Sequence, residues 1–209
     1  MNKKNTAILA VILVSMFSFI AIAEVQSMNA KQTLSAKQRG IVPIAAFTAT
    51  GDMEKLKTAL NEGLDAGLTI NEIKEILVQL YAYAGFPRSL NSINTFIGVL
   101  EEREQKGIKD EFGKEPSPMP ANKSSIELGT EIQTRLIGAP ATGKYITFAP
   151  AIDQFLKGHL FGDIFGRDNL DFRSREIATI SALASMEGVN SQLQAHFEIG
   201  FNVGLNKTQ

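Results

Sequence analysis

The stretch LDFRSREIATISALASMEGVNSQLQAHFEIGFNVGL, residues 170–205, decides the fold of this chain, because residues 34–68 repeat its pattern. With one extra residue, Glu187, in the later copy, the two stretches share residues that are mostly apolar or glycine, the types that set packing and turns. The sequence therefore predicts one helical unit that occurs twice. The coincident pairs are Leu34/Leu170, Arg39/Arg175, Ile41/Ile177, Ile44/Ile180, Ala46/Ala182, Gly51/Gly188, Leu56/Leu193, Gly63/Gly200, Gly67/Gly204 and Leu68/Leu205.

The two copies differ at positions that carry chemistry. Gly40 of the first copy aligns with Glu176, and Ala59 aligns with His196. Only the second copy therefore has a carboxylate and an imidazole, the pair of groups suited to acid–base catalysis. Catalytic residues are expected in the second copy.

Capping residues and glycines divide the first half of the chain into helices. Ser35 to Gln38 and Thr69 to Glu72 have the form of capping boxes, and Asp52 is a plausible helix cap. Apolar residues recur at helical spacing between these points and the glycines that follow. The pattern predicts helices over about 35–50, 52–66, 69–84 and 86–100.

The second half begins with a proline-rich linker, residues 107–125, in which Pro116, Pro118 and Pro120 cannot continue a helix. Short helices are predicted near 126–136 and 150–160, and the second copy supplies helices over about 171–186 and 190–203. No counterpart of the helix at 69–84 follows, so an apolar groove is expected that the first half or another subunit must fill. Because no window alternates apolar and polar residues, the predicted fold class is all-α.

The first residues resemble an export signal. Lys3 and Lys4 precede an uncharged apolar stretch from Ala7 to Ala23 that ends in Ala21-Ile22-Ala23. The alternative, an uncleaved membrane anchor, is less well matched because the stretch falls short of the roughly 20 apolar residues that span a bilayer. We expect residues 1–23 to be a signal peptide cleaved after Ala23, and the mature protein to be periplasmic or secreted and free of the membrane.

Composition excludes several functions. The chain has no cysteine, so thiol redox chemistry is impossible and stability must come from apolar burial and oligomerisation. Removing Lys3 and Lys4 leaves 19 basic and 22 acidic residues, a balance that does not attract nucleic acid. Only two histidines occur, far apart in sequence, and no metal-ligand spacing exists.

Two segments carry a resemblance to a known family: Arg175 to Ala184, followed by Gln192 to His196 and the glycines Gly200 and Gly204, and the segment Tyr81 to Asn91. They resemble the carboxymuconolactone decarboxylase family, which includes the alkylhydroperoxidase D-like proteins. The resemblance implies an all-helical, oligomeric, alkylhydroperoxidase D-like bundle in tandem copies. The predicted division is 24–106 for the first repeat and 126–209 for connecting helices plus a second repeat without its last helix.

Function follows from the resemblance only in part. The peroxidase branch of the family uses two cysteines where this chain has Val189 and Gln192, so peroxiredoxin-type activity is not expected. The decarboxylase branch works without metal or organic cofactor, and Glu176 and His196 match its glutamate and histidine positions. The resemblance implies that these two residues are catalytic.

Decarboxylation leaves charge on a carbon next to a carbonyl, and a histidine is well suited to protonate that carbon. A carboxylate beside the histidine fixes its tautomer. Glu176 and His196 fall on consecutive antiparallel helices, with backbones offset by roughly 6 to 7 Å along the axis. Arg175 is a candidate for holding a substrate carboxylate or oxyanion, and Tyr83 for lining the pocket.

Simpler interpretations exist for each of these residues. A histidine flanked by apolar residues often only packs, and a glutamate near a helix start is favoured by the helix dipole alone. Arg175 recurs as Arg39, which suggests a salt bridge to a neighbouring helix, and Tyr83 is a candidate core residue. His159 is expected at the surface or at a subunit contact, and residues 138–143 form a loop.

Two functions remain open at this stage. The first is a cofactor-independent lyase or isomerase, carboxy-lyase-like, acting on a small lactone or carboxylic acid. The second is a non-catalytic oligomeric scaffold or ligand-binding protein of the cell envelope. A homo-oligomer is expected in either case.

Overall fold

The computed structural model describes residues 33–209, so the predicted signal peptide, residues 1–23, lies outside the described residues. Residues 36–205 form one compact unit, to which residues 33–35 and 206–209 do not belong. This unit is all helical: strands are absent throughout the described residues, and the predicted all-α class is confirmed. Within residues 33–209, no helix is both long and apolar enough to cross a bilayer.

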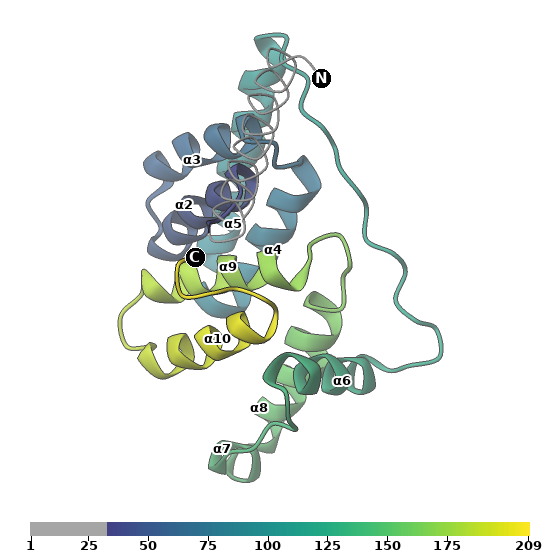
Figure 1. Ribbon diagram of the computed structural model, residues 1–209. Helices are drawn as coiled ribbons and strands as arrows, with labels where there is room; N and C mark the ends of the chain where they lie inside the picture. The colour runs from purple at the N-terminus through teal and green to yellow at the C-terminus, as the bar shows by residue number, and fades with distance from the viewer. Residues whose placement is uncertain (1–32) are drawn as a thin grey trace, which may run out of the picture. The chain divides into compact units, whose positions relative to one another are not determined.

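The helices follow the predicted order, with three changes of detail, the last of which, at residues 150–164, is described below (Figure 1). The predicted fourth helix continues five residues further, through a charged end that favours helix. A short helix also begins at Lys144, where none was predicted. The helices are α2 (Ala36–Thr50), α3 (Met53–Asp65), α4 (Ile70–Ala84), α5 (Phe86–Gln105), α6 (Ser125–Ile137), α7 (Lys144–Phe148), α8 (Pro150–Gln154), η1 (Phe155–Ile164), α9 (Phe172–Ala184) and α10 (Asn190–Asn202).

Side-chain caps fix where the main helices begin. Asp52 accepts a hydrogen bond from the amide of Lys55 at the start of α3. Thr69 and Glu72 form the predicted capping box of α4, satisfying two amides that the helix itself leaves free. Asp171 accepts from the Ser174 amide and so fixes the first turn of α9, the helix that carries Glu176.

The core of the unit lies where α2, α4 and α9 meet. Helix α2 packs against α3 and α9, and α4 packs against α2, α5 and α9. Ile44 of α2 and Ile76 and Leu80 of α4 are wholly buried there, as are Leu56 and Leu60 of α3. The first half of the chain therefore supplies a helix, α4, that covers α9 of the second half.

Equivalent glycines of the predicted repeat make equivalent contacts. A Cβ at Gly63 would meet Ile44 at 2.8 Å and Leu68 at 3.1 Å. A Cβ at Gly200 would meet Ile180 and Leu205, the aligned residues, each at 3.1 Å. Just past the end of each helix, four residues after these positions, lies a second glycine, Gly67 or Gly204, with a φ of +94° that a side chain rarely adopts.

The two hairpins differ in what covers them. Helix α5 packs on α3, so Leu60 is 0% and Leu64 is 7% exposed. Their aligned residues on α10, Phe197 and Phe201, are 45% and 47% exposed. Helix α4 of the first half thus covers α9, where a groove was expected from the absent helix. The face of α10 that carries Phe197 and Phe201 stays open to solvent.

The helix predicted over about 150–160 has a different form in the structure. An α-helical turn, α8, passes at Phe155 into the π-helix η1, which extends to Ile164. Glycines allow η1 and α6 to approach backbone to backbone: a Cβ at Gly129 would overlap the carbonyl oxygen of Lys157, and a Cβ at Gly162 would overlap that of Ser125. This contact depends on a distant helix, which helical periodicity does not reveal.

The proline-rich linker makes specific contacts despite its lack of regular structure. Its residues Glu111 and Phe112 accept backbone hydrogen bonds from Ile70 and Asn71, each at 2.9 Å. These amides belong to the first turn of α4, where a helix has no acceptors of its own. The linker therefore helps to cap α4 before it crosses to α6.

Candidate functional site

His196 and Glu176 meet in a direct contact between α9 and α10, which lie side by side (Figure 1). The imidazole Nδ1 lies 2.7 Å from the carboxylate Oε2 of Glu176. Glu176 is 0% exposed and His196 is 8% exposed. The two long side chains thus bridge the backbone offset expected from the sequence and form a buried pair.

The contact links the imidazole tautomer to the ionisation of Glu176. With Glu176 ionised, its oxygens only accept, and Nδ1 is then the donor of this hydrogen bond. Nε2 has no hydrogen-bond partner in the described part of the chain and is not one of its enclosed polar atoms. This nitrogen is therefore the one that could exchange a proton with a bound molecule.

Glu176 lies one residue beyond the first turn of α9, which contains no acidic residue. The helix dipole acts mainly within that turn, so the dipole alone does not account for a buried carboxylate here. Only Oε2 is hydrogen-bonded: Oε1 is buried and has no partner among residues 33–209. A half-satisfied buried carboxylate is uncommon in a region that only packs.

Tyr83, in the last turn of α4, packs against the His196 side of the pair. Its ring meets the His196 imidazole edge to face, with ring centroids 5.5 Å apart. Its hydroxyl is buried and makes no hydrogen bond with the described residues. Burial, and next the negative charge of Glu176, raise the pKa of Tyr83 far above its ordinary value, and the Thr179 hydroxyl opposes that effect.

Arg175 does not point toward this pair but belongs to a buried network with α4. Its Nη1 donates to Gln79 Oε1 at 2.9 Å, and its Nη2 donates to Glu75 Oε1 at 3.2 Å and to the carbonyl of Arg167 at 2.8 Å. Burial lowers the pKa of Arg175, while the Glu75 carboxylate opposes that effect. Both terminal nitrogens are therefore engaged, as expected for a structural ion pair.

Gln79, Glu75 and Thr179 are the network residues that the sequence did not single out. Gln79 donates to the Arg175 carbonyl at 2.9 Å and to Thr179 Oγ1 at 2.8 Å, and all three side chains are at most 2% exposed. The one available signal was a polar residue at a buried helix position. That signal says nothing of the partner, because the partner lies about a hundred residues away.

The remaining candidates lie apart from the pair. His159 is half exposed and contacts Asp163 at 2.9 Å, with its ring 5.6 Å from that of Tyr81. Among the residues that the structure describes, no group of three acidic or histidine side chains could hold a metal ion. The structure thus brings together Glu176, His196 and Tyr83, and keeps Arg175 beside them in a separate network.

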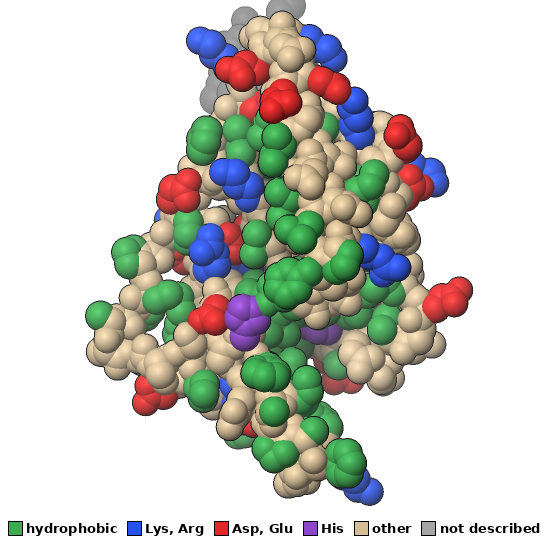
Figure 2. Space-filling model, turned by 180° about the vertical axis from the view of Figure 1, so that it is seen from behind, with side chains coloured by type: hydrophobic (Ala, Val, Ile, Leu, Met, Phe, Trp, Pro, Cys, Tyr) green, Lys and Arg blue, Asp and Glu red, His purple; other side chains and the backbone are tan. Residues whose placement is uncertain are grey.

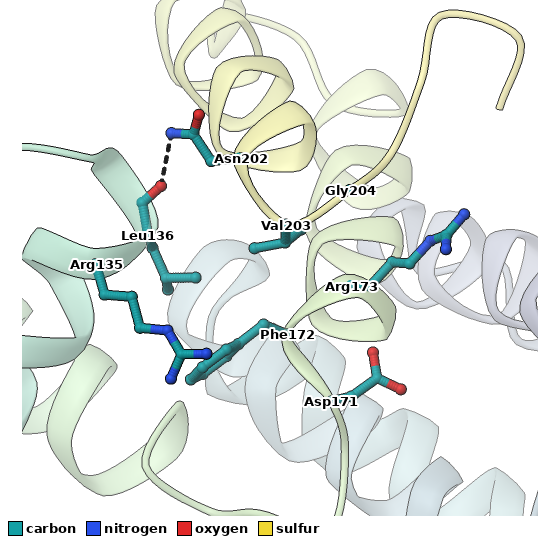
Figure 3. Close-up of a pocket in the computed structure, with 8 residues that line it drawn as sticks. All are labelled: Arg135, Leu136, Asp171, Phe172, Arg173, Asn202, Val203 and Gly204. Carbon is teal, nitrogen blue, oxygen red and sulfur yellow. Dashed lines mark hydrogen bonds between the residues drawn. The ribbon is translucent and has the colours of Figure 1, made fainter.

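A pocket of about 520 Å³ opens where α6, α9 and α10 meet (Figure 3). Its walls include Arg135, whose guanidinium lies 5.3 Å from the centre of the Phe172 ring, and Leu136, whose carbonyl accepts from Asn202 at 2.9 Å. Arg173 extends away from these residues in the view of Figure 3. Neither Glu176 nor His196 lines this pocket.

Comparison with known proteins supports the family resemblance. Residues 20–96 match the model of the carboxymuconolactone decarboxylase family. The match includes α2, α3, α4 and Tyr83, but stops before Glu176 and His196. A search of curated proteins found no match.

Proposed function

We propose that this carboxymuconolactone decarboxylase-like protein carries out cofactor-independent acid–base chemistry on a small lactone or carboxylic acid, as a decarboxylase or an isomerase. The observation that carries the proposal is the 2.7 Å contact between His196 and Glu176. In this proposal His196 is the proton donor and acceptor, and Glu176 holds its tautomer and stabilises its charged form.

The proton transfer would occur at Nε2 of His196. In a decarboxylation, the bond between the carboxylate carbon and its neighbour breaks, carbon dioxide leaves, and the electron pair stays on a carbon conjugated to a carbonyl. The imidazolium gives its Nε2 proton to that carbon, and the neutral imidazole then takes a proton from water. In an isomerisation, the same nitrogen removes a proton from one carbon and returns it to another.

Arg175 has a positioning role in this proposal. Its terminal nitrogens are held by Glu75, Gln79 and the Arg167 carbonyl, so binding a substrate anion would require breaking a buried ion pair. Anchoring Arg175 to α4 also fixes the next residue of α9, Glu176. The face of Tyr83 beside His196 is the proposed contact for the substrate's apolar part.

The direct test measures carbon dioxide release from a panel of small lactones and keto acids by the mature protein. With any substrate found, His196→Ala should lower the turnover rate by about 10² to 10⁴, the contribution typical of a positioned acid–base group. His159→Ala is the matched control, because His159 is the other histidine and is half exposed. Unchanged turnover in His196→Ala would refute the proposed role.

A second candidate is a non-catalytic oligomeric scaffold or ligand-binding protein of the cell envelope. This alternative is favoured because the His196–Glu176 pair is almost enclosed, with His196 only 8% exposed. It is also favoured because neither residue of the pair lines the 520 Å³ pocket. No turnover across the panel, together with ligand binding that survives His196→Ala, would select this alternative.

Self-association forms part of both candidates. Hydrophobic side chains gather on the face shown in Figure 2, and α5 exposes Phe86 by 62% and Leu90 by 55%. Phe197 and Phe201 of α10 form a second exposed apolar row. The aligned face of α3 is covered by a helix, whereas this face of α10 is not. We propose that a second copy covers α10, and that light scattering will show a lower mass for Phe197→Asp than for the unsubstituted protein.

Export is proposed from the first 23 residues alone. Cleavage after Ala23 would leave Glu24 at the amino terminus of the mature protein. Mass spectrometry of the protein recovered from the periplasm or medium checks this, and an intact Met1 on a membrane-bound product would support the anchor instead.

A further inference from the structure

Two buried polar atoms without partners belong to the two side chains that contact His196. One is Oε1 of Glu176, whose other oxygen contacts His196, and the second is the hydroxyl of Tyr83. The Tyr83 ring contacts the same imidazole. Two neighbours of His196 therefore each present an unmatched polar atom in one buried region.

The two atoms are chemically complementary. A carboxylate oxygen accepts hydrogen bonds and a phenol donates one. Leaving both unmatched in a buried region would be unfavourable, because each would lose its water without replacement. When polar atoms in such a region are further apart than a direct contact, one ordered water commonly joins them.

We propose that Tyr83 is a positioning residue whose hydroxyl donates a hydrogen bond to Oε1 of Glu176, directly or through one buried water. The bond holds Glu176 as a carboxylate turned toward His196. Tyr83 ends α4 in the first half of the chain, so the acid–base pair of the second half is completed by a helix of the first. The catalytic meaning of this arrangement rests on the proposed function, whereas the hydrogen bond itself does not.

Few other charged groups face Glu176. Within α9 the neighbour is Arg175, which is neutralised by Glu75 of α4. From α10 the facing group is His196, and from α4 it is Tyr83, whose pKa the charge of Glu176 raises. Helix α2 buries only side chains that do not titrate, namely Ile41, Ile44, Ala45, Thr48 and Ala49.

The test is an NMR measurement of the ring nitrogens of the two histidines in the ¹⁵N-labelled mature protein, which shows which ring nitrogen carries the proton. His159→Gln assigns the signals, since it leaves one histidine. The Tyr83→Phe variant keeps the ring contact with His196 but loses the donor. Without that donor Glu176 is held less firmly toward His196, so the ratio of the Nδ1–H to the Nε2–H tautomer of His196 should fall by about tenfold, the effect of one hydrogen bond.

Tyr81→Phe is the matched control, because Tyr81 lies on the same helix with its ring stacked on Phe86, 4.2 Å away. It should leave the tautomer ratio of His196 unchanged. An unchanged ratio in a folded Tyr83→Phe variant, or an equal change in Tyr81→Phe, would overturn the proposal. A changed ratio in Tyr83→Phe without turnover by the unsubstituted protein would refute the proposed function and leave the hydrogen bond standing.

Discussion

Arg175 and Glu176 show how two adjacent charged residues can be buried completely. Both are 0% exposed, yet successive residues of a helix point about 100° apart, so each meets a different neighbour. Arg175 meets Glu75 and Gln79 of α4, and Glu176 meets His196 of α10. Charged residues are rarely buried unless they are paired, and here each has its own partner.

Tyr83 gives this region a dependence on alkaline pH. Its folded-state pKa lies above the ordinary value near 10, so its stabilising contribution is complete below about pH 10 and declines as the pH rises further. The Tyr83→Phe variant has no such proton to lose. Between pH 10 and 12 its free energy of unfolding should fall less steeply, by up to about 1.4 kcal/mol per pH unit.

Denaturant unfolding at a series of alkaline pH values measures how steeply the free energy of unfolding falls with pH, both in the unsubstituted protein and in Tyr83→Phe. Tyr81→Phe serves as the reference for the loss of a hydroxyl from the same helix. Parallel slopes for the unsubstituted protein and Tyr83→Phe would contradict a buried, neutral phenol.

At the scale of elements, glycine contacts decide how helices approach. Gly63 and Gly200 receive the aligned isoleucine and leucine side chains in the two hairpins, which supports the proposal that the hairpins are copies of one unit. Gly129 and Gly162 instead allow backbone contact between α6 and η1. A side chain at the latter positions would meet backbone atoms, which have no freedom to move aside.

Gly129→Ala should therefore separate α6 from η1 and destabilise the protein by about 1 to 3 kcal/mol, the range for overpacked sites. Gly98→Ala is the control, because Gly98 is inside α5 and a Cβ there meets nothing within 4 Å. Alanine favours helix over glycine, so Gly98→Ala should be neutral or stabilising by up to about 1 kcal/mol. Thermal and denaturant unfolding compare the two, and equal effects would contradict the close contact.

At the scale of the whole described unit, residues far apart in sequence are joined by charged contacts of the linker. Asp168, between η1 and α9, accepts hydrogen bonds from Lys114 and from the amide and hydroxyl of Ser117. The Lys114 ammonium, followed by the Ser117 donors, lowers the pKa of Asp168. The linker is thereby held at one point between its capping contact with α4 and its entry into α6.

Asp168→Asn should loosen the linker without unfolding the helices. Amide hydrogen exchange at Ser117 should become faster, because its amide donates to Asp168 at 2.7 Å. Since the folded-state pKa of Asp168 is lowered, protection in the unsubstituted protein should be complete above about pH 4 and be lost as the pH falls below it. Asp153→Asn, which removes a contact to Lys157 elsewhere, should leave Ser117 protected.

The sequence alone determined the helical class, the side-chain caps of α3 and α4 and the approximate bounds of α9 and α10, and it predicted candidate acid–base residues in the second hairpin. These features are local: caps, glycines and helical periodicity act over a few residues, so the chain itself displays them. It also indicated Glu176 and His196, because only the second copy carries them and because they match the glutamate and histidine positions that the family resemblance implies.

Only the tertiary structure decided what surrounds that pair. Three contacts join residues that are at least about thirty positions apart in sequence. They are the hydrogen bonds of Arg175 with Glu75 and Gln79, the ring contact of Tyr83 with His196, and the backbone contact of η1 with α6. Such contacts depend on how helices pack, and packing depends on the shapes of whole faces rather than on spacing along one helix. That is why the sequence could name Glu176, His196, Arg175 and Tyr83 as candidates, whereas only the structure shows that Tyr83 contacts the pair and that Arg175 is held by α4 instead.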